Sequence, residues 1–250
     1  MRVYLSLVRR ELASYFVSLT GYVVIAYVAL LLGSSFVILV EELTRDPSDM
    51  PITDLFYATL FFWMILLPAA PVITMRTFAL EKASGTFETL MTTPVSDGAV
   101  VLAKFTSSML FYLLTWVPLL GCIYVVQRFS SNPTALDLGP VASTFLGILL
   151  FGGLFMSLGC FASALTRSQI VAAMTSYALG LGLFILSFLS LIIPPDTGWR
   201  TAVLSQLSMI EHMQEFVRGV VDTRYVVYYV SLTALFLFLT LKVVESRRWR

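Results

Sequence analysis

Charged side chains are scarce in this sequence, and so are the residues that build metal sites and disulfide frameworks. Asp, Glu, Lys and Arg make up 12% of the 250 residues, about half the share that is usual in a soluble globular domain. Both cysteines, Cys122 and Cys160, lie inside apolar runs without a metal-binding spacing, so we interpret them as packing residues. The formal net charge of +1 gives no basis for expecting a nucleic-acid partner.

Hydrophobic residues are correspondingly abundant in this chain. Hydrophobic residues make up 58% of the chain, more than one soluble core of this length can bury, so a lipid bilayer is the expected solvent. The basic N-terminus precedes an apolar run, as in a signal peptide, but residues 16–40 exceed the roughly 7–15 residues of a signal-peptide core. We therefore expect this run to be retained as a membrane helix.

Six apolar runs are long enough to cross a bilayer, and they predict an all-α membrane protein with one transmembrane domain over residues 1–250. Apolar residues that recur at intervals of three and four before the first run predict an N-terminal interfacial helix. Thr201–Asp222, between the fifth and sixth spans, has the amphipathic pattern of a helix with one polar face. The expected spans cover about 16–40, 55–75, 100–126, 141–165, 170–193 and 225–243.

The distribution of basic residues predicts how these spans are oriented. An even number of spans puts both termini on one side, and that side holds eleven of the 16 Lys and Arg residues. Because positive charge accumulates in cytoplasmic loops, we expect both termini in the cytoplasm. Thr201–Asp222 would then lie on the extracytoplasmic side.

The expected membrane interior lacks the side chains of a pump or an enzyme. No span carries an ionisable residue near its centre, whereas ion-coupled transporters usually keep such residues there. Neither the motifs of intramembrane proteases nor a Gly-x-x-x-x-Gly-Lys phosphate loop is present. A six-span protein of this kind either acts passively or takes its energy from a partner, and an intramembrane enzyme is disfavoured.

The segment from Arg76 to Lys104 is the longest polar interruption with basic residues at both ends. Gly85 is expected to end any helix that continues from the second span. Thr86 can then cap a short helix over Phe87–Thr92, which Pro94 ends. After it, Ser96 is expected to cap the third span.

A short helix between two spans can sit in a groove on a soluble protein. We expect its apolar side chains to insert and its charged side chains to fix orientation by ion pairing. An ordinary solvated loop explains the same spacing and is favoured on spacing alone, because short loop helices are common. The candidate contact residues are Glu81, Lys82, Gly85, Thr86, Phe87, Glu88, Leu90, Met91 and Pro94.

The same segment resembles the signature of the ABC type-2 transporter permeases. The matching residues run from Glu81 to Leu90, Glu-Lys-Ala-Ser-Gly-Thr-Phe-Glu-Thr-Leu, followed by Thr93–Ser96 and Leu102–Lys104. Leu80 departs from the pattern, because relatives often carry a second acidic residue there. Further stretches resemble the gliding-motility-associated branch, so that the resemblance spans nearly the whole chain: Arg10–Phe16, Gly21–Tyr22, His212–Asp222 and Glu245–Trp249.

The resemblance implies a fold and a set of partners. The loop between the second and third spans would be a cytoplasmic coupling helix, and the helices between the fifth and sixth spans would be re-entrant from the extracytoplasmic side. Two copies of a cytoplasmic ABC ATPase would bind ATP and Mg, and a second permease subunit would complete a homodimer or heterodimer. This chain would bind no cofactor and no nucleic acid, and would lie in the bilayer of the bacterial inner membrane, with a periplasmic auxiliary protein as a further candidate partner.

The expected function is that of a non-catalytic permease subunit of an ATP-driven exporter. The alternative is a mechanotransmission or scaffold subunit that drives a periplasmic partner without solute flux. The extracytoplasmic segment supplies a second candidate site, a gate or partner contact formed by His212, Glu215, Phe216 and Arg218.

Two single residues have simpler interpretations. A lone histidine has no ligand set beside it, so His212 is interpreted as a polar-face residue that hydrogen-bonds within its own segment. Arg76 is expected either to reach the lipid headgroups or to pair with Glu81, about one turn away.

Overall fold

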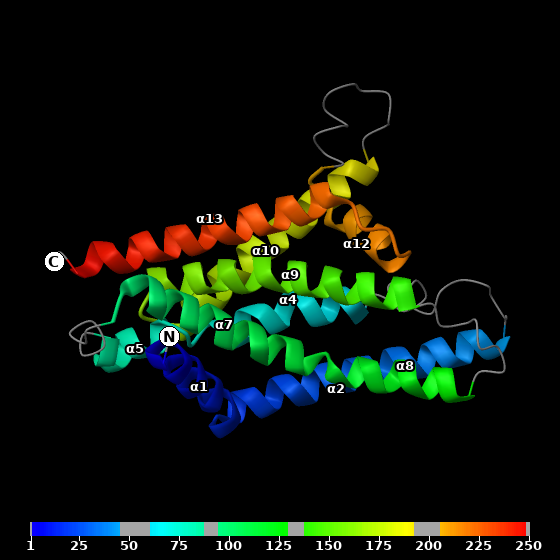
Figure 1. Cartoon of the computed structure of the whole chain (residues 1–250), viewed down its shortest axis with the longest axis horizontal. Coiled ribbons are helices and arrows are strands. Elements are labelled where there is room, and N and C mark those ends of the chain that lie inside the picture. Colours follow the sequence, from blue (N-terminus) through cyan, green and yellow to red (C-terminus); the bar gives the residue numbers. More distant parts are fainter. Residues whose placement is uncertain (1, 46–60, 88–94, 130–137, 193–205, 249–250) are drawn as a thin grey trace.

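The protein is a bundle of helices in which the long members run side by side (Figure 1). The computed structural model describes residues 2–45, 61–87, 95–129, 138–192 and 206–248, and within these ranges it contains helices and no strand. The helices are α1 (Arg2–Val17), α2 (Leu19–Arg45), α4 (Phe61–Thr74), α5 (Ala79–Ser84), α7 (Asp97–Thr115), α8 (Val117–Phe129), α9 (Leu138–Leu165), α10 (Gln169–Ile192), α12 (Met209–Val217) and α13 (Thr223–Arg248).

Six stretches of helix in the described ranges are long and apolar enough to cross a membrane, which confirms the prediction of an all-α multi-pass membrane protein. The first begins at Leu19 rather than near residue 16, because α1 continues to Val17 and the chain turns at Ser18. Residues 55–60 of the predicted second span lie outside the described residues. The six stretches are Leu19–Glu41, Phe61–Ser84, Asp97–Val125, Leu138–Leu165, Gln169–Phe188 and Thr223–Ser246.

Helix α9 is the centre of the bundle. It packs against α4, α7, α10, α12 and α13 and is buried along most of its length. Its small residues allow neighbours to approach closely, because a Cβ atom added at Gly159 would lie 2.0 Å from Oγ1 of Thr74 in α4. One added at Gly152 would lie 2.2 Å from the Tyr112 ring in α7. Gly159 and Gly152, both in the predicted fourth span, therefore leave room for side chains of α4 and α7 to pack directly on the backbone of α9.

Prolines lie in two of the spans, and in one of them a neighbouring side chain replaces a hydrogen bond that is lost. Pro68 inside α4 has no N–H for the Met64 carbonyl, and the Tyr27 hydroxyl from α2 donates to that carbonyl at 2.8 Å. The third span divides into α7 and α8 at Trp116, two residues before Pro118, as expected for a residue that cannot continue the ladder.

Two helix ends follow the sequence prediction closely. Ser96 caps α7, its Oγ accepting from the Ala99 N–H at 3.4 Å, with Asp97 in the first turn. Gly85 ends α5 in the left-handed conformation with φ 75°, which glycine adopts without steric cost. The helix that Gly85 ends is α5, which the sequence did not predict as a separate element.

The two ends of the bundle differ. Both chain termini and α5 lie toward one end, and α12 lies beside the start of α13, away from that end (Figure 1). The charged residues of the Arg76–Lys104 segment and the amphipathic segment before α13 are therefore on opposite sides of the apolar helices.

We expect Gly159→Ala to destabilise the bundle by about 1–3 kcal/mol, because the added methyl group overlaps Thr74. Gly182→Ala in α10 is the matched control, since nothing lies within 4 Å of a Cβ atom there. Thermal unfolding of the purified protein in detergent measures both. Equal melting temperatures for the two variants would contradict the close contact between α4 and α9.

Candidate functional site

The turn between α4 and α5 is held by the central helix. The Ser163 hydroxyl of α9 accepts from the N–H groups of Phe78 and Ala79, both at 3.1 Å, and donates to the Met75 carbonyl at 3.1 Å. These groups need an outside partner because they lie at the ends of helices, where the intrahelical ladder is incomplete. Ser163 thus fixes the point at which α5 leaves the bundle.

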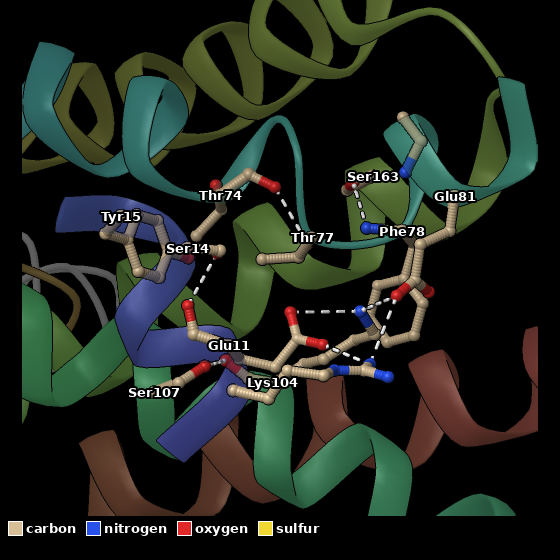
Figure 2. A network of polar contacts seen from close by, with 12 residues as sticks. Glu11, Ser14, Tyr15, Thr74, Thr77, Phe78, Glu81, Lys104, Ser107 and Ser163 are labelled. Carbon is tan, nitrogen blue, oxygen red and sulfur yellow. Dashed lines mark hydrogen bonds and ion pairs between the residues drawn. The ribbon is translucent and has the colours of Figure 1, made fainter. Parts of the chain in front are cut away.

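A cluster of four charged residues joins α5 to two other helices, and we refer to Arg10, Glu11, Glu81 and Lys104 as the Lys104 cluster (Figure 2). Lys104 Nζ from α7 lies 2.8 Å from Glu81 Oε1 of α5 and 3.3 Å from Glu11 Oε2 of α1. Arg10 lies 2.6 Å from Glu11 and 3.6 Å from Glu81. Residues that are far apart in the sequence therefore form one ion-pair network at the end of the bundle that carries α5.

Burial makes this network important for the fold. The Lys104 side chain is 2% exposed, and a buried ammonium group is tolerated only when it is paired. Two carboxylates and two cations balance within the cluster, and the Phe78 ring lies 5.4 Å from Lys104 Nζ. The hydrogen bond to Glu11 raises the pKa of Arg10, which favours the charged form of its guanidinium group.

Several of the residues predicted to contact a partner protein instead bind or pack against other residues of this chain. Lys82 donates to the Ala164 carbonyl at the end of α9 and lies 5.2 Å from the Phe87 ring. Phe87 is buried against Phe78 and Val101, so its ring does not project from the surface of this chain as a docking residue would. Glu81, expected to orient a partner, is bound in the Lys104 cluster. Glu88, Leu90, Met91 and Pro94, with most of the predicted helix over 87–92, lie outside the described residues.

The hydrogen bonds of Arg76 test one of its two expected roles, the ion pair with Glu81. Its Nη1 donates to the hydroxyls of Ser18 and Thr20 at the junction of α1 and α2, and the Thr20 contact is 2.6 Å. The expected pair with Glu81 is wrong, because the Lys104 cluster binds that carboxylate. Arg76 instead anchors the first span to the end of α4.

A cavity of about 360 Å³ lies between α1, the α4–α5 turn and α7. It connects the Lys104 cluster to Arg76, and Leu80, where the family pattern often has an acidic residue, is part of its wall. The lining residues are Arg10, Glu11, Ser14, Tyr15, Ser18, Arg76, Thr77, Leu80, Glu81 and Lys104.

The second predicted site lies around α12. Ser208 caps this helix, Gly219 ends the segment with φ 91°, and Ser187 of α10 accepts from the Met209 N–H at 2.9 Å. The buried face of α12 packs on α9, where a Cβ atom at Gly147 would lie 3.0 Å from Met213 Sδ. The segment is therefore fixed to the bundle by α9 and α10.

His212 is on this buried face, so its predicted position on a polar face is wrong. Its side chain is completely buried, with Nδ1 3.0 Å from the Tyr229 hydroxyl of α13 and the ring stacked on Tyr225 at 3.9 Å. The hydrogen bond joins α12 to the next helix rather than staying within the segment. Phe216 is buried on the same face, whereas Arg218 is exposed and Glu215 is partly exposed.

Sequence reasoning missed the partners of the α5 segment. It identified Glu81 and Lys104 as charges in a chain poor in charge, but did not pair them, and it did not assign Arg10, Glu11 or Ser163 to the site. One signal was available: a Lys at the start of an apolar span requires a counterion. Which carboxylates serve as counterions of Lys104 could not be read from the sequence, because Glu11 and Glu81 reach it only through the packing of α1 and α5 against α7.

We expect Lys104→Met to destabilise the protein by about 3–5 kcal/mol, because it leaves two carboxylates facing one another without the buried cation. The matched control is Lys242→Met, whose ion pair with Glu245 is more than a third exposed on both sides and contributes about 1 kcal/mol or less. A double-mutant cycle with Glu81→Gln, followed by thermal unfolding, isolates the pair. Additive effects of the two substitutions would contradict the network.

At the other end, Tyr229→Phe is expected to cost about 1–3 kcal/mol of stability, because it removes the hydroxyl that bonds to the buried His212 ring. Tyr228→Phe is the control, since Tyr228 meets the same imidazole edge to face at 5.7 Å, with no bond from its hydroxyl among the described residues. The two melting temperatures should differ, and a loss as large for Tyr228→Phe would assign the effect to ring packing instead.

Comparison with known proteins agrees with the six-span architecture. Residues 20–244 match the model of the family described as ABC-2 family transporter protein, which covers nearly the whole chain outside α1. A search of curated proteins found no match. The family match does not distinguish the gliding-motility branch, which stays a prediction. The chain belongs to the ABC-2 transporter family and is a multi-pass transmembrane permease.

Proposed function

We propose that this chain is the transmembrane permease subunit of an ATP-driven exporter, and that it couples ATP hydrolysis by separate ABC ATPase subunits to the movement of a substrate. Family membership implies association with an ABC ATPase. ATP and Mg would be bound by two copies of that ATPase, and a second permease subunit, identical or different, would complete the complex. The expected location is the bacterial inner membrane, with both termini and α5 in the cytoplasm.

The observation that carries this proposal is the attachment of α5 to three other helices. Glu81 is paired with Lys104 of α7 and lies near Arg10 of α1, and Lys82 is bonded to the end of α9. A soluble partner that displaces the segment around Gly85 therefore pushes on spans two, three and four together. This attachment supports coupling through rigid movement of helices, which requires no charge inside the membrane.

The candidate contact with the ATPase is accordingly narrower than the sequence suggested. Glu81, Lys82 and Phe87 are engaged in the bundle and transmit force rather than touch the partner. Contact with the ATPase is left to the residues after Gly85, Glu88 to Pro94, together with the exposed Leu80. On this proposal Glu81, Lys82 and Phe87 transmit movement to the bundle, and the residues from Glu88 to Pro94 contact the ATPase.

Glu88→Arg is expected to reduce co-purification of the ATPase at least about tenfold, because charge reversal at an interface turns an ion pair into a repulsion. Deletion of Thr86–Thr92 should abolish ATP turnover that depends on the permease. Glu245→Arg is the control, since it reverses a partly exposed charge in α13, outside the coupling segment. Full ATPase binding and full turnover in both Glu88→Arg and the deletion would reject the coupling role.

Export and mechanotransmission give different results in reconstituted vesicles. An exporter moves a solute across the bilayer when ATP is supplied with the ATPase alone. ATP turnover that requires a periplasmic partner and moves no solute would instead identify a mechanotransmission subunit. The exposed Arg218 and the partly exposed Glu215 on the outer side of α12 are then the first positions at which to test contact with that partner.

A further inference from the structure

The cavity beneath α1 has an excess of positive charge at one end. Its lining contains three cations and two carboxylates, and both carboxylates, Glu11 and Glu81, belong to the Lys104 cluster, which is balanced internally. The third cation, Arg76, forms its hydrogen bonds with hydroxyl groups, and among the described residues no carboxylate pairs with it. Arg76 therefore leaves a net positive charge of one unit in the cavity.

The hydroxyl groups around Arg76 leave donors for an anion. Ser18 and Thr20 each accept from Arg76 and are bonded to one another, so one of their two hydroxyl hydrogens is used between them. The other hydrogen has no acceptor among the described residues. Arg76 Nε is likewise without an acceptor there, although it is buried. A guanidinium group beside a free hydroxyl donor is suited to a phosphate oxygen.

Neither carboxylate of the cavity excludes an anion beside Arg76, because Glu81 is paired with Lys104 at 2.8 Å and Glu11 is distant along α1. Glu11 and Ser18 are seven residues apart along α1, which corresponds to about 10 Å at the helical rise of 1.5 Å per residue. That separation is about one Debye length at physiological ionic strength. Ser14 and Tyr15, which lie between Glu11 and Ser18 in the sequence, also line the cavity. An anion near Arg76 is thus attracted by the guanidinium more strongly than it is repelled by Glu11.

Apolar side chains flank the same point on the outside. Val17 and Leu19, on either side of Ser18, are 87% and 80% exposed, and Phe16 is also exposed. In a membrane protein such residues lie against acyl chains rather than water. We refer to Phe16–Leu19, which joins α1 to α2, as the elbow. The elbow therefore places the Ser18 hydroxyl, with Arg76 bonded to it, directly beside a surface suited to lipid tails.

We propose that the cavity beneath α1 binds the phosphate of a phospholipid headgroup on Arg76 and Ser18, with the acyl chains along the elbow, and that it prefers headgroups with a net negative charge. A phosphate diester is common to all phospholipids, and the uncompensated charge of Arg76 selects phosphatidylglycerol over zwitterionic phosphatidylcholine. The lipid would lie between the first span and the α4–α5 turn. The proposal concerns lipid binding and not transport, and Leu80, one of the residues proposed to contact the ATPase, also lines this cavity.

Lipid binding to the purified full chain tests the proposal without measuring transport. Phosphatidylglycerol and phosphatidylcholine with identical acyl chains are added separately to the protein in detergent, and bound lipids are counted by native mass spectrometry. We expect phosphatidylglycerol to bind about tenfold more tightly, as for one charge-assisted hydrogen bond. Arg76→Gln should abolish this preference. Arg9→Gln, which removes the same charge from an exposed position on α1 outside the cavity, should retain it.

A second variant keeps the test decisive if Arg76→Gln does not fold. Ser18→Asp keeps Arg76 and places a carboxylate beside it. The new ion pair should stabilise the fold, so we expect the variant to fold with a higher melting temperature than wild type. Because the charge of Arg76 is then neutralised, the variant should lose the preference for phosphatidylglycerol. Adding inorganic phosphate instead of lipid tests whether the cavity binds free phosphate rather than a lipid headgroup. The proposal is overturned if both lipids bind wild type equally, if Ser18→Asp keeps the preference, or if inorganic phosphate saturates the site while phosphatidylglycerol does not bind.

Discussion

The buried ammonium group of Lys104 is the constraint on which this end of the protein depends. At 2% exposure it has to be compensated, and the two carboxylates that compensate it come from α1 and α5. Satisfying this one charge therefore fixes three helices relative to each other. The Phe78 ring and the Ser163 hydroxyl extend the same junction to the α4–α5 turn and to α9. The polar segment that interrupts the spans is thus an integral part of the bundle and not a solvated loop over its described residues.

Features that depend on a few neighbouring residues could be predicted from the sequence. Six long apolar runs have no stable arrangement other than helices in lipid, and the cap at Ser96 and the left-handed Gly85 follow from local backbone chemistry. The start of the first span was predicted too early, because α1 is itself partly apolar and only the turn at Ser18 separates it from α2. The family, likewise, was recognisable because its signature is contiguous in the chain.

Side-chain partners between distant segments could not be predicted in the same way. On the basis of sequence the candidate partner of Glu81 was Arg76, about one turn away, whereas the packing of α5 against α7 brings Lys104 to it instead. His212 looked like a polar-face residue because Glu215 and Asp222 follow it at helical spacing. Its burial depends on a cage of tyrosines from α13, which replaces water as the hydrogen-bonding environment. Sequence spacing contains neither the rotation of α12 nor the position of α13.

Helix α9 connects the two polar regions without a polar path through the membrane. Near one end, Ser163 and the Ala164 carbonyl hold the α4–α5 turn and Lys82; near the other, the Ser143 hydroxyl donates to the Phe216 carbonyl and Gly147 packs on Met213. Ser143 and Ser163 are twenty residues apart, about 30 Å along a helix, which matches the hydrocarbon thickness of a bilayer. Because α9 is buried and closely packed along this length, a displacement of α5 must either break these bonds or move α9 and α12 with it. A rigid helix can therefore transmit movement across an apolar interior that contains no ionisable relay, and the scarcity of charge in the spans is consistent with that mode of action.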